Sequence, residues 1–222
     1  MQKNKLWLFG DSFVCSNTGW INKLSVQRNL EVVHLGTAGG SIGRLLKELN
    51  REHPNIKEND RVIIVYTACG RYFFDNRDFS TPLIELEENE FVINEYNEKI
   101  TEYAGQVYTK KEIESFKEFS PFLFTPTSYD QNAFIIRSIH NFVLPTLRTK
   151  YIAELFAFDF PHQNHCGLYF PTFEINYDFK KYPLLGEFID THNLDWRQNR
   201  IHIEDNATDL FLETYKELFK NF

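Results

Sequence analysis

Four short apolar runs are spaced along the chain, and each has the length and composition of a buried β-strand. They cover residues 5–9, 31–35, 61–66 and 151–158. The third run holds the β-branched residues Val62 to Val65, which is typical of a strand covered on both faces in a parallel sheet. These runs predict a parallel central sheet.

Apolar residues at helical spacing separate the runs and close the chain. Residues 20–24 suit a short helix, and residues 42–50 suit a longer one with three leucines on one face. Residues 131–148 are again helical in pattern, although Pro145 is expected to bend or end that helix. A last helix is expected to turn these side chains inward: Leu210, Phe211, Tyr215, Leu218 and Phe219. Strands alternating with helices predict an α/β fold with right-handed crossovers.

Residues 72–130 interrupt this alternation. Residues 82–87 and 90–96 look like the two strands of a β-hairpin with one apolar face. Thr109 and Glu112 have the spacing of a capping box, which predicts the start of a short helix. We interpret residues 72–130 as an insertion at the carboxyl edge of the sheet, where it lines or covers a site.

Length and charge exclude several classes of function. The 222 residues fit one domain with a good-sized core or a small core domain that carries an insertion. We favour the second, as a single domain over residues 1–222. The net charge is −7 without a long basic run, so we expect no nucleic-acid partner. The apolar stretch after Lys3 and Lys5 is too short for a signal peptide, and no segment approaches the roughly 20 apolar residues of a membrane span. We therefore expect no membrane partner and a cytoplasmic protein, or one exported without a leader.

The cysteine pattern indicates neither a disulfide framework nor a metal site. Cys15, Cys69 and Cys166 are odd in number, and reduced thiols are the simpler interpretation. His162 and His165 stand near Cys166, but no second ligand group follows at matching spacing. We expect a polar loop there, with no metal and no cofactor.

The strongest motif is Gly10-Asp11-Ser12-Phe13, directly after the first apolar run. Gly10 permits a sharp turn that would lift Ser12 to the carboxyl edge of the sheet, where open α/β sheets build their sites. The motif resembles the first block of the SGNH/GDSL hydrolases. The resemblance implies a three-layer, flavodoxin-like α/β fold and makes Ser12 the nucleophile.

The turn from Gly36 to Ser41 resembles the second block of the same family. If Gly36 is aligned with the first glycine of that block, Gly39 takes the oxyanion position. A glycine suits this role because its N–H approaches the developing charge without a side chain in the way. A plain tight turn and a phosphate cradle are the alternatives, although the spacing lacks a Gly-Lys-Ser/Thr ending.

The third block departs from the family. The family has Gly-x-Asn-Asp, with an asparagine that donates to the oxyanion, where this chain has Thr67-Ala68-Cys69-Gly70-Arg71. Thr67 and Arg71 are the candidate replacements, Thr67 as an oxyanion donor and Arg71 as a substrate-binding group. A structural or surface role for Arg71 is the alternative.

The C-terminal segment supplies the expected base. His202 stands just ahead of the last helix, as in the family's Asp-x-x-His block, but the position of the aspartate is held by Asn199. Asn199 would orient the imidazole without stabilising its charge. Asp195 as the acid, a serine–histidine pair and a degenerate site are the other interpretations.

These residues predict a serine esterase or deacylase that hydrolyses an O-acyl ester of a small molecule or a carbohydrate. Acyl transfer to another hydroxyl uses the same groups. The departures resemble divergent members from bacteriophages and bacteria, and a phage origin would also allow a place in the virion. The alternatives are a catalytically degenerate protein that binds a glycan or protein partner, and a flavodoxin-like nucleotide or phosphate binder.

Overall fold

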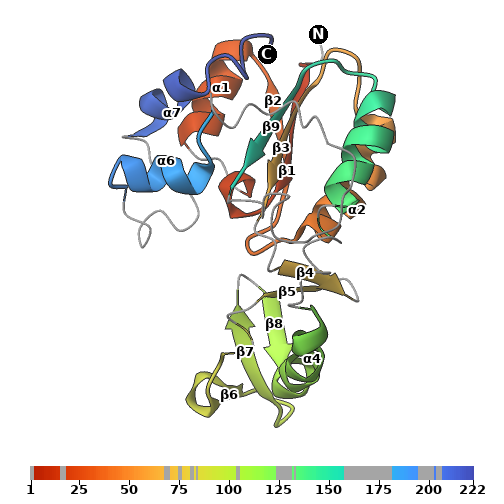
Figure 1. Ribbon diagram of the computed structural model, residues 1–222, viewed down its shortest axis with the longest axis vertical. Helices are drawn as coiled ribbons and strands as arrows, with labels where there is room; N and C mark the ends of the chain where they lie inside the picture. Colours follow the sequence, from red (N-terminus) through yellow and green to blue (C-terminus); the bar gives the residue numbers. More distant parts are fainter. Residues whose placement is uncertain are drawn as a thin grey trace, which may run out of the picture.

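The computed structural model has a four-stranded parallel sheet at its centre, in the order β2-β1-β3-β9 (Figure 1). Its strands are β1 (Lys5–Gly10), β2 (Glu31–Gly36), β3 (Arg61–Tyr66) and β9 (Ile152–Phe156). The described residues are 3–15, 19–67, 71–74, 77–80, 83, 85–103, 106–123, 132, 134–157, 182–194, 203 and 207–222. The four predicted strands and the parallel sheet are confirmed.

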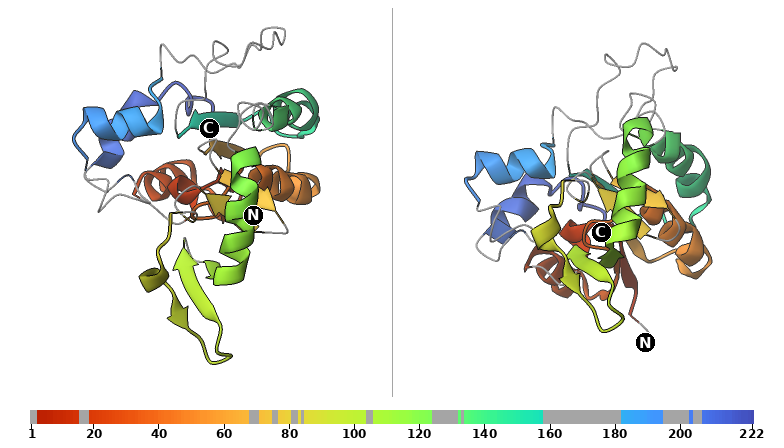
Figure 2. Two further views of the ribbon diagram at one scale, coloured as in Figure 1. Left: turned by 60° about the horizontal axis from the view of Figure 1, so that its bottom comes forward. Right: turned by 90° about the horizontal axis from the view of Figure 1, so that it is seen from below.

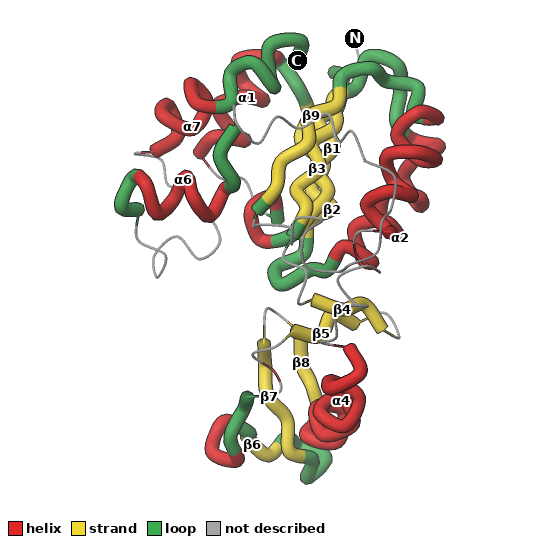
Figure 3. The backbone as a smooth tube through the Cα atoms, in the orientation of Figure 1, coloured by secondary structure: helices red, strands yellow, loops and turns green. Residues whose placement is uncertain are grey.

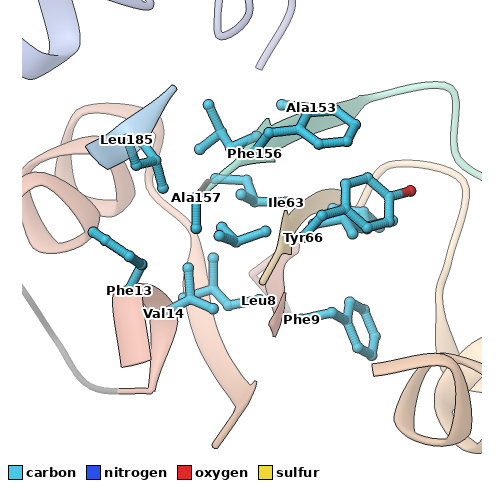
Figure 4. Packing of buried hydrophobic residues seen from close by; sticks show 14 of the residues in the cluster. Leu8, Phe9, Phe13, Val14, Ile63, Tyr66, Ala153, Phe156, Ala157 and Leu185 are labelled. Atoms are coloured by element: carbon cyan, nitrogen blue, oxygen red, sulfur yellow. The ribbon is translucent and has the colours of Figure 1, made fainter. Parts of the chain in front are cut away.

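Helices cover both faces of this sheet (Figures 1 and 3). One face carries α1 (Gly19–Arg28), α6 (Leu185–Thr191) and α7 (Thr208–Thr214). The other carries α2 (Ile42–Glu52), the helical residues 134–138, the π-helix η4 (Ile139–Val143) and the 3₁₀ turn η5 (Leu144–Thr146). In Figure 4, Phe9 of β1 and Tyr66 of β3 lie on one side of the sheet, and Phe13 of the turn after β1 and Leu185 of α6 lie on the other. The α/β architecture is compatible with a flavodoxin-like fold.

The helical predictions hold with two refinements. Pro145 lies in η5, so the segment after residue 134 tightens and ends where the proline was expected to end it. In the terminal segment Phe211, Tyr215 and Phe219 are buried, but Leu210 is 42 % exposed. The prediction for Leu210 was wrong because the buried face follows the i, i+4 spacing of Phe211, Tyr215 and Phe219, which turns Leu210 toward solvent.

A smaller lobe lies beyond the carboxyl ends of the central strands, and in the view from below it lies in front of the sheet (Figures 1 and 2). It contains the antiparallel hairpin of β4 (Arg71–Phe74) and β5 (Arg77–Ser80), and a second sheet in the order β6-β7-β8. The other elements of the lobe are η3 (Glu88–Glu90), β6 (Val92–Ile93), β7 (Lys99–Tyr103), β8 (Gln106–Thr109) and α4 (Lys110–Leu123). Its own apolar cluster consists of Phe79, Leu83, Tyr108, Ile113 and Phe116.

The hairpin predicted for residues 82–87 and 90–96 was wrong. The described residues 85–87 are not in a strand, and Val92–Ile93 pairs with β7 instead. The local reason is that the Glu90 carboxylate accepts from the Glu87 N–H at 2.7 Å, which stabilises the 3₁₀ turn η3 in place of a strand. The capping box is confirmed, since Thr109 N–H donates to Glu112 Oε2 at 2.8 Å and Glu112 N–H to Thr109 Oγ1 at 3.2 Å.

None of the helices in the described part of the chain combines the length and the hydropathy that crossing a membrane requires. Within the same residues, no group of three or more histidine, cysteine, aspartate or glutamate side chains is arranged to hold a metal ion. The stretch from His162 to Cys166 lies outside the described residues.

Candidate active site

The turn after β1 needs a glycine at its first position. Gly10 has φ +149°, and a Cβ there would lie 2.6 Å from the Val65 carbonyl oxygen of the neighbouring strand. Asp11 then closes the turn, because its Oδ1 accepts from Phe13 N–H and its backbone oxygen accepts from Val14 N–H, both at 3.1 Å. Ser12 therefore begins the 3₁₀ turn η1 (Ser12–Val14) at the carboxyl edge of the sheet.

The Asp11 carboxylate is fully buried and joins three segments of the chain. Its Oδ2 accepts from Thr67 Oγ1 at 2.8 Å and from Arg71 Nη1 at 3.0 Å. Arg71 Nη1 also donates to Thr67 Oγ1 at 2.7 Å. A buried carboxylate with a paired guanidinium and further hydrogen-bond donors is a compensated charge, so this cluster fixes the Asp11 turn to the end of β3 and the start of β4.

This cluster gives the two predicted replacement donors an internal partner. The single hydroxyl proton of Thr67 is directed to Asp11, and Arg71 Nη1 is shared among Asp11, Thr67 and, at 3.4 Å, the Gly40 carbonyl oxygen. The end of β3 and the start of β4 thus meet the turn after β1 through Asp11, a residue for which the sequence indicated no role of its own.

Ser12 lies at this edge with its hydroxyl available. The residue is 8 % exposed, and no described residue forms a hydrogen bond with its Oγ. Its carbonyl oxygen accepts from Cys15 Sγ at 3.4 Å. Because Asp11 accepts hydrogen bonds from the backbone N–H groups of Phe13 and Val14, the turn fixes where the Ser12 side chain leaves the backbone.

The glycine turn after β2 packs directly on the Ser12 turn. Thr37 N–H donates to the Gly10 carbonyl oxygen at 3.1 Å, and a Cβ on Gly36 would lie 2.8 Å from the Asp11 carbonyl oxygen. Gly40 N–H donates to Thr37 O at 2.7 Å, which closes the turn around Gly39 at φ +70°. Among the described residues, no acceptor takes the backbone N–H of Ser12 or of Gly39. Two donors on adjacent turns can therefore be offered to an anion.

The residues predicted from the C-terminal segment, Asp195, Asn199 and His202, lie outside the described residues. Ile203, directly after His202, is 1 % exposed and belongs to the main core. Ser12, Gly39, Thr67 and Arg71 are brought together at one edge, and the partners from the chain's other end remain predictions.

Two buried polar clusters were missed by sequence reasoning. In one, Asp78 of β5 accepts from the backbone and side chain of Ser41. In the other, Tyr66 donates to Glu154 Oε2 at 2.7 Å and His140 Nε2 lies 2.7 Å from the same oxygen. Burial, and then the Glu154 charge, raise the pKa of Tyr66 well above its usual value. Neither cluster could be predicted from a motif or a periodic pattern, because each joins residues tens of positions apart in the sequence.

No known family model, curated protein or solved structure matches this chain. The architecture alone therefore defines its class: an α/β protein with a four-stranded parallel sheet, helices on both faces, and two turns at the carboxyl edge whose Ser12 and Gly39 N–H groups have no acceptor among the described residues.

Proposed function

We propose that the protein is a serine esterase or deacylase of the SGNH type, acting on an O-acyl ester of a small molecule or a carbohydrate. The observation that carries the proposal is the pair of adjacent turns at the carboxyl edge of the sheet. One bears the Ser12 hydroxyl, and together they offer the N–H groups of Ser12 and Gly39. A nucleophile beside preorganised backbone donors is the arrangement that acyl transfer requires.

The proposed reaction has two halves. Ser12 Oγ attacks the ester carbonyl while His202 takes its proton, and the tetrahedral oxyanion accepts hydrogen bonds from the N–H groups of Ser12 and Gly39. The C–O bond to the leaving alcohol then breaks, and the imidazolium returns the proton to that oxygen. Water, deprotonated by His202, attacks the acyl-enzyme and releases the acid and the free Ser12 hydroxyl. Asn199 and Asp195 are the candidates for orienting the imidazole.

The contacts of Asp11 refine the roles of the other candidates. Because Thr67 and Arg71 both donate to its carboxylate, we assign them to holding the Ser12 turn, and the oxyanion depends on backbone donors. A site without the family's asparagine donor is expected to be slower, since one oxyanion donor is worth about 10²–10³ in rate.

The test is hydrolysis of a short-chain aryl ester by the wild type and by Ser12→Ala. We expect Ser12→Ala to lose about 10³-fold or more in kcat. The matched control is Ser25→Ala, because Ser25 is buried (5 % exposed, against 8 % for Ser12) but its hydroxyl donates to Asn22 O in α1. Equal rates for the wild type and Ser12→Ala would refute the proposal and favour a binding protein. Transfer of the acyl group to an added alcohol would identify a transferase.

A further inference from the structure

The hairpin β4–β5 of the smaller lobe contacts both turns of the candidate site: Arg71 of β4 donates to Asp11, and Asp78 of β5 accepts from Ser41. We propose that Asp78 is a positioning residue for the reaction, which acts through Ser41 to hold the turn that presents the Gly39 N–H. The inference rests on the proposed esterase function and names a residue outside the sequence motifs.

Asp78 is buried and its carboxylate is directed at the start of α2. Its Oδ1 accepts from the backbone N–H of Ser41 at 2.9 Å and from Ser41 Oγ at 2.6 Å. Ser41 in turn is the N-cap of α2, because its Oγ accepts from Arg44 N–H at 3.3 Å. Arg44 Nε pairs with Asp78 Oδ2 and compensates the buried charge. Ser41 is thus the residue that caps α2, and Asp78 holds Ser41 in place.

The peptide group between Gly40 and Ser41 is held at both of its polar atoms by the same hairpin. Its N–H donates to Asp78, in β5, and its carbonyl oxygen accepts from Arg71, the first residue of β4, at 3.4 Å. On its other side, Gly40 N–H is bonded to Thr37 O. The peptide planes that follow Gly39 are therefore fixed, and this limits the directions in which the Gly39 N–H can point.

The lobe supplies the rigidity behind this contact. Tyr108 of β8 donates from its hydroxyl to the Asp78 carbonyl oxygen, and Phe79, the next residue, packs in the lobe's own apolar cluster. The backbone of Asp78 is therefore held by the lobe, and its carboxylate contacts Ser41 at the candidate site. An oxyanion donor acts only when it is aligned within a fraction of an ångström, so loss of this contact is expected to reduce kcat.

A purely structural role for Asp78 predicts something different. If Asp78 only capped α2, its loss would lower the free energy of unfolding without changing kcat among the molecules that remain folded. If it positions Gly39, kcat falls, and KM changes little because the nucleophile and the rest of the site are intact.

The experiment compares Asp78→Ala, which removes the acceptor of both Ser41 donors, with Arg77→Gln. Arg77 is the adjacent residue of the hairpin, but it donates to Val107 O at 2.7 Å and pairs with Glu112, both within the lobe. We expect Asp78→Ala to lower kcat about 10-fold to 100-fold with KM changed less than about twofold, and to slow fluorophosphonate labelling of Ser12 to a similar degree. Arg77→Gln is expected to retain the wild-type kcat.

Ser41→Ala supplies a second variant should Asp78→Ala fail to fold, because it removes the Oγ contact and keeps the backbone N–H. In the double variant its effect on kcat should not add to that of Asp78→Ala. Wild-type kcat in either folded variant would overturn the inference and leave the esterase proposal standing. A wild-type protein that neither hydrolyses esters nor labels at Ser12 would overturn the esterase proposal itself, and the positioning role with it.

Discussion

Asp11 at the edge of the central sheet and Glu88 on the surface of the smaller lobe hold their charges in opposite environments. In the sheet, the Asp11 carboxylate is inaccessible to solvent and accepts from Phe13, Thr67 and Arg71. In the lobe, Glu88 has a side chain that is 57 % exposed and pairs with Lys99 and Lys110 on the surface. Buried charges cost much free energy if a partner is lost, whereas exposed pairs contribute little. The comparison indicates that buried carboxylates at the sheet edge, Asp11 and Asp78 of the lobe's hairpin, fix the geometry of the site, whereas Glu88 pairs with lysines on the surface and contributes little.

The largest effect on stability is expected for Asp11→Ala. The substitution removes the acceptor of three donors and leaves Arg71, whose side chain is 20 % exposed, without its anionic partner among the described residues. We expect the free energy of unfolding in urea to fall by about 3 kcal/mol. The double variant Asp11→Ala/Arg71→Met should recover part of this loss, because no uncompensated charge remains. A single variant as stable as the wild type would remove the contrast drawn between Asp11 and Glu88.

The next effect tests whether the lobe is a separate cooperative unit. Ile113 is fully buried in the lobe's cluster, and its truncation to alanine is expected to cost about 2–4 kcal/mol locally. Hydrogen exchange should show lost protection in β7, β8 and α4, with β1 and β3 unchanged. Ile64→Ala, in the main core, serves as the control and should reduce protection throughout the central sheet. Equal loss in β1 and β3 for Ile113→Ala would show that the two clusters unfold as one.

A smaller effect is expected for a single hydroxyl in the core. Tyr66→Phe removes the donor to Glu154 Oε2, leaving that carboxylate with His140 as its other close partner, at a cost of about 1–2 kcal/mol. The control is Tyr96→Phe in the lobe, since Tyr96 is 76 % exposed. The thermal unfolding midpoint of Tyr66→Phe should be lower than that of Tyr96→Phe. Equal midpoints would show that the buried hydrogen bond from Tyr66 to Glu154 does not stabilise the protein.

The smallest effect is expected for Glu88→Gln, and it depends on pH. Hydrogen bonds from Lys110, and then from Lys99, lower the pKa of Glu88 from 4.5 to about 2. Because the folded-state pKa is the lower one, the stabilisation is complete above about pH 4.5 and is lost as the pH falls toward 2. The difference in unfolding midpoint between the wild type and Glu88→Gln should therefore be small at neutral pH, decrease with salt, and vanish near pH 2. A difference that grows on acidification would contradict the assigned pairs.

The sheet could be predicted from the sequence because its strands are continuous apolar runs. A short run of this kind indicates a strand that is buried on both faces. The 82–87 hairpin was wrong because alternating apolar residues in an acidic stretch imitate a strand, whereas the Glu87–Glu90 contact favours a turn. At the site, the sharp turn at Gly10 was predictable because it needs a backbone conformation that favours glycine, whereas Gly39 was chosen by resemblance to a family motif. The contacts of Asp11 with Arg71 and of Asp78 with Ser41 were not, because they span 60 and 37 positions and leave no periodic signal.

The proposed function requires Ser12 to be a nucleophile activated at the edge of this sheet. Its most direct test is labelling of the folded wild-type protein with a fluorophosphonate, followed by peptide mapping, with Ser25→Ala and Ser12→Ala measured in parallel. The account predicts one modified serine, Ser12, in the wild type and in Ser25→Ala, and no modification in Ser12→Ala. A folded wild-type protein that takes up no label, or carries it on another serine, would contradict the account.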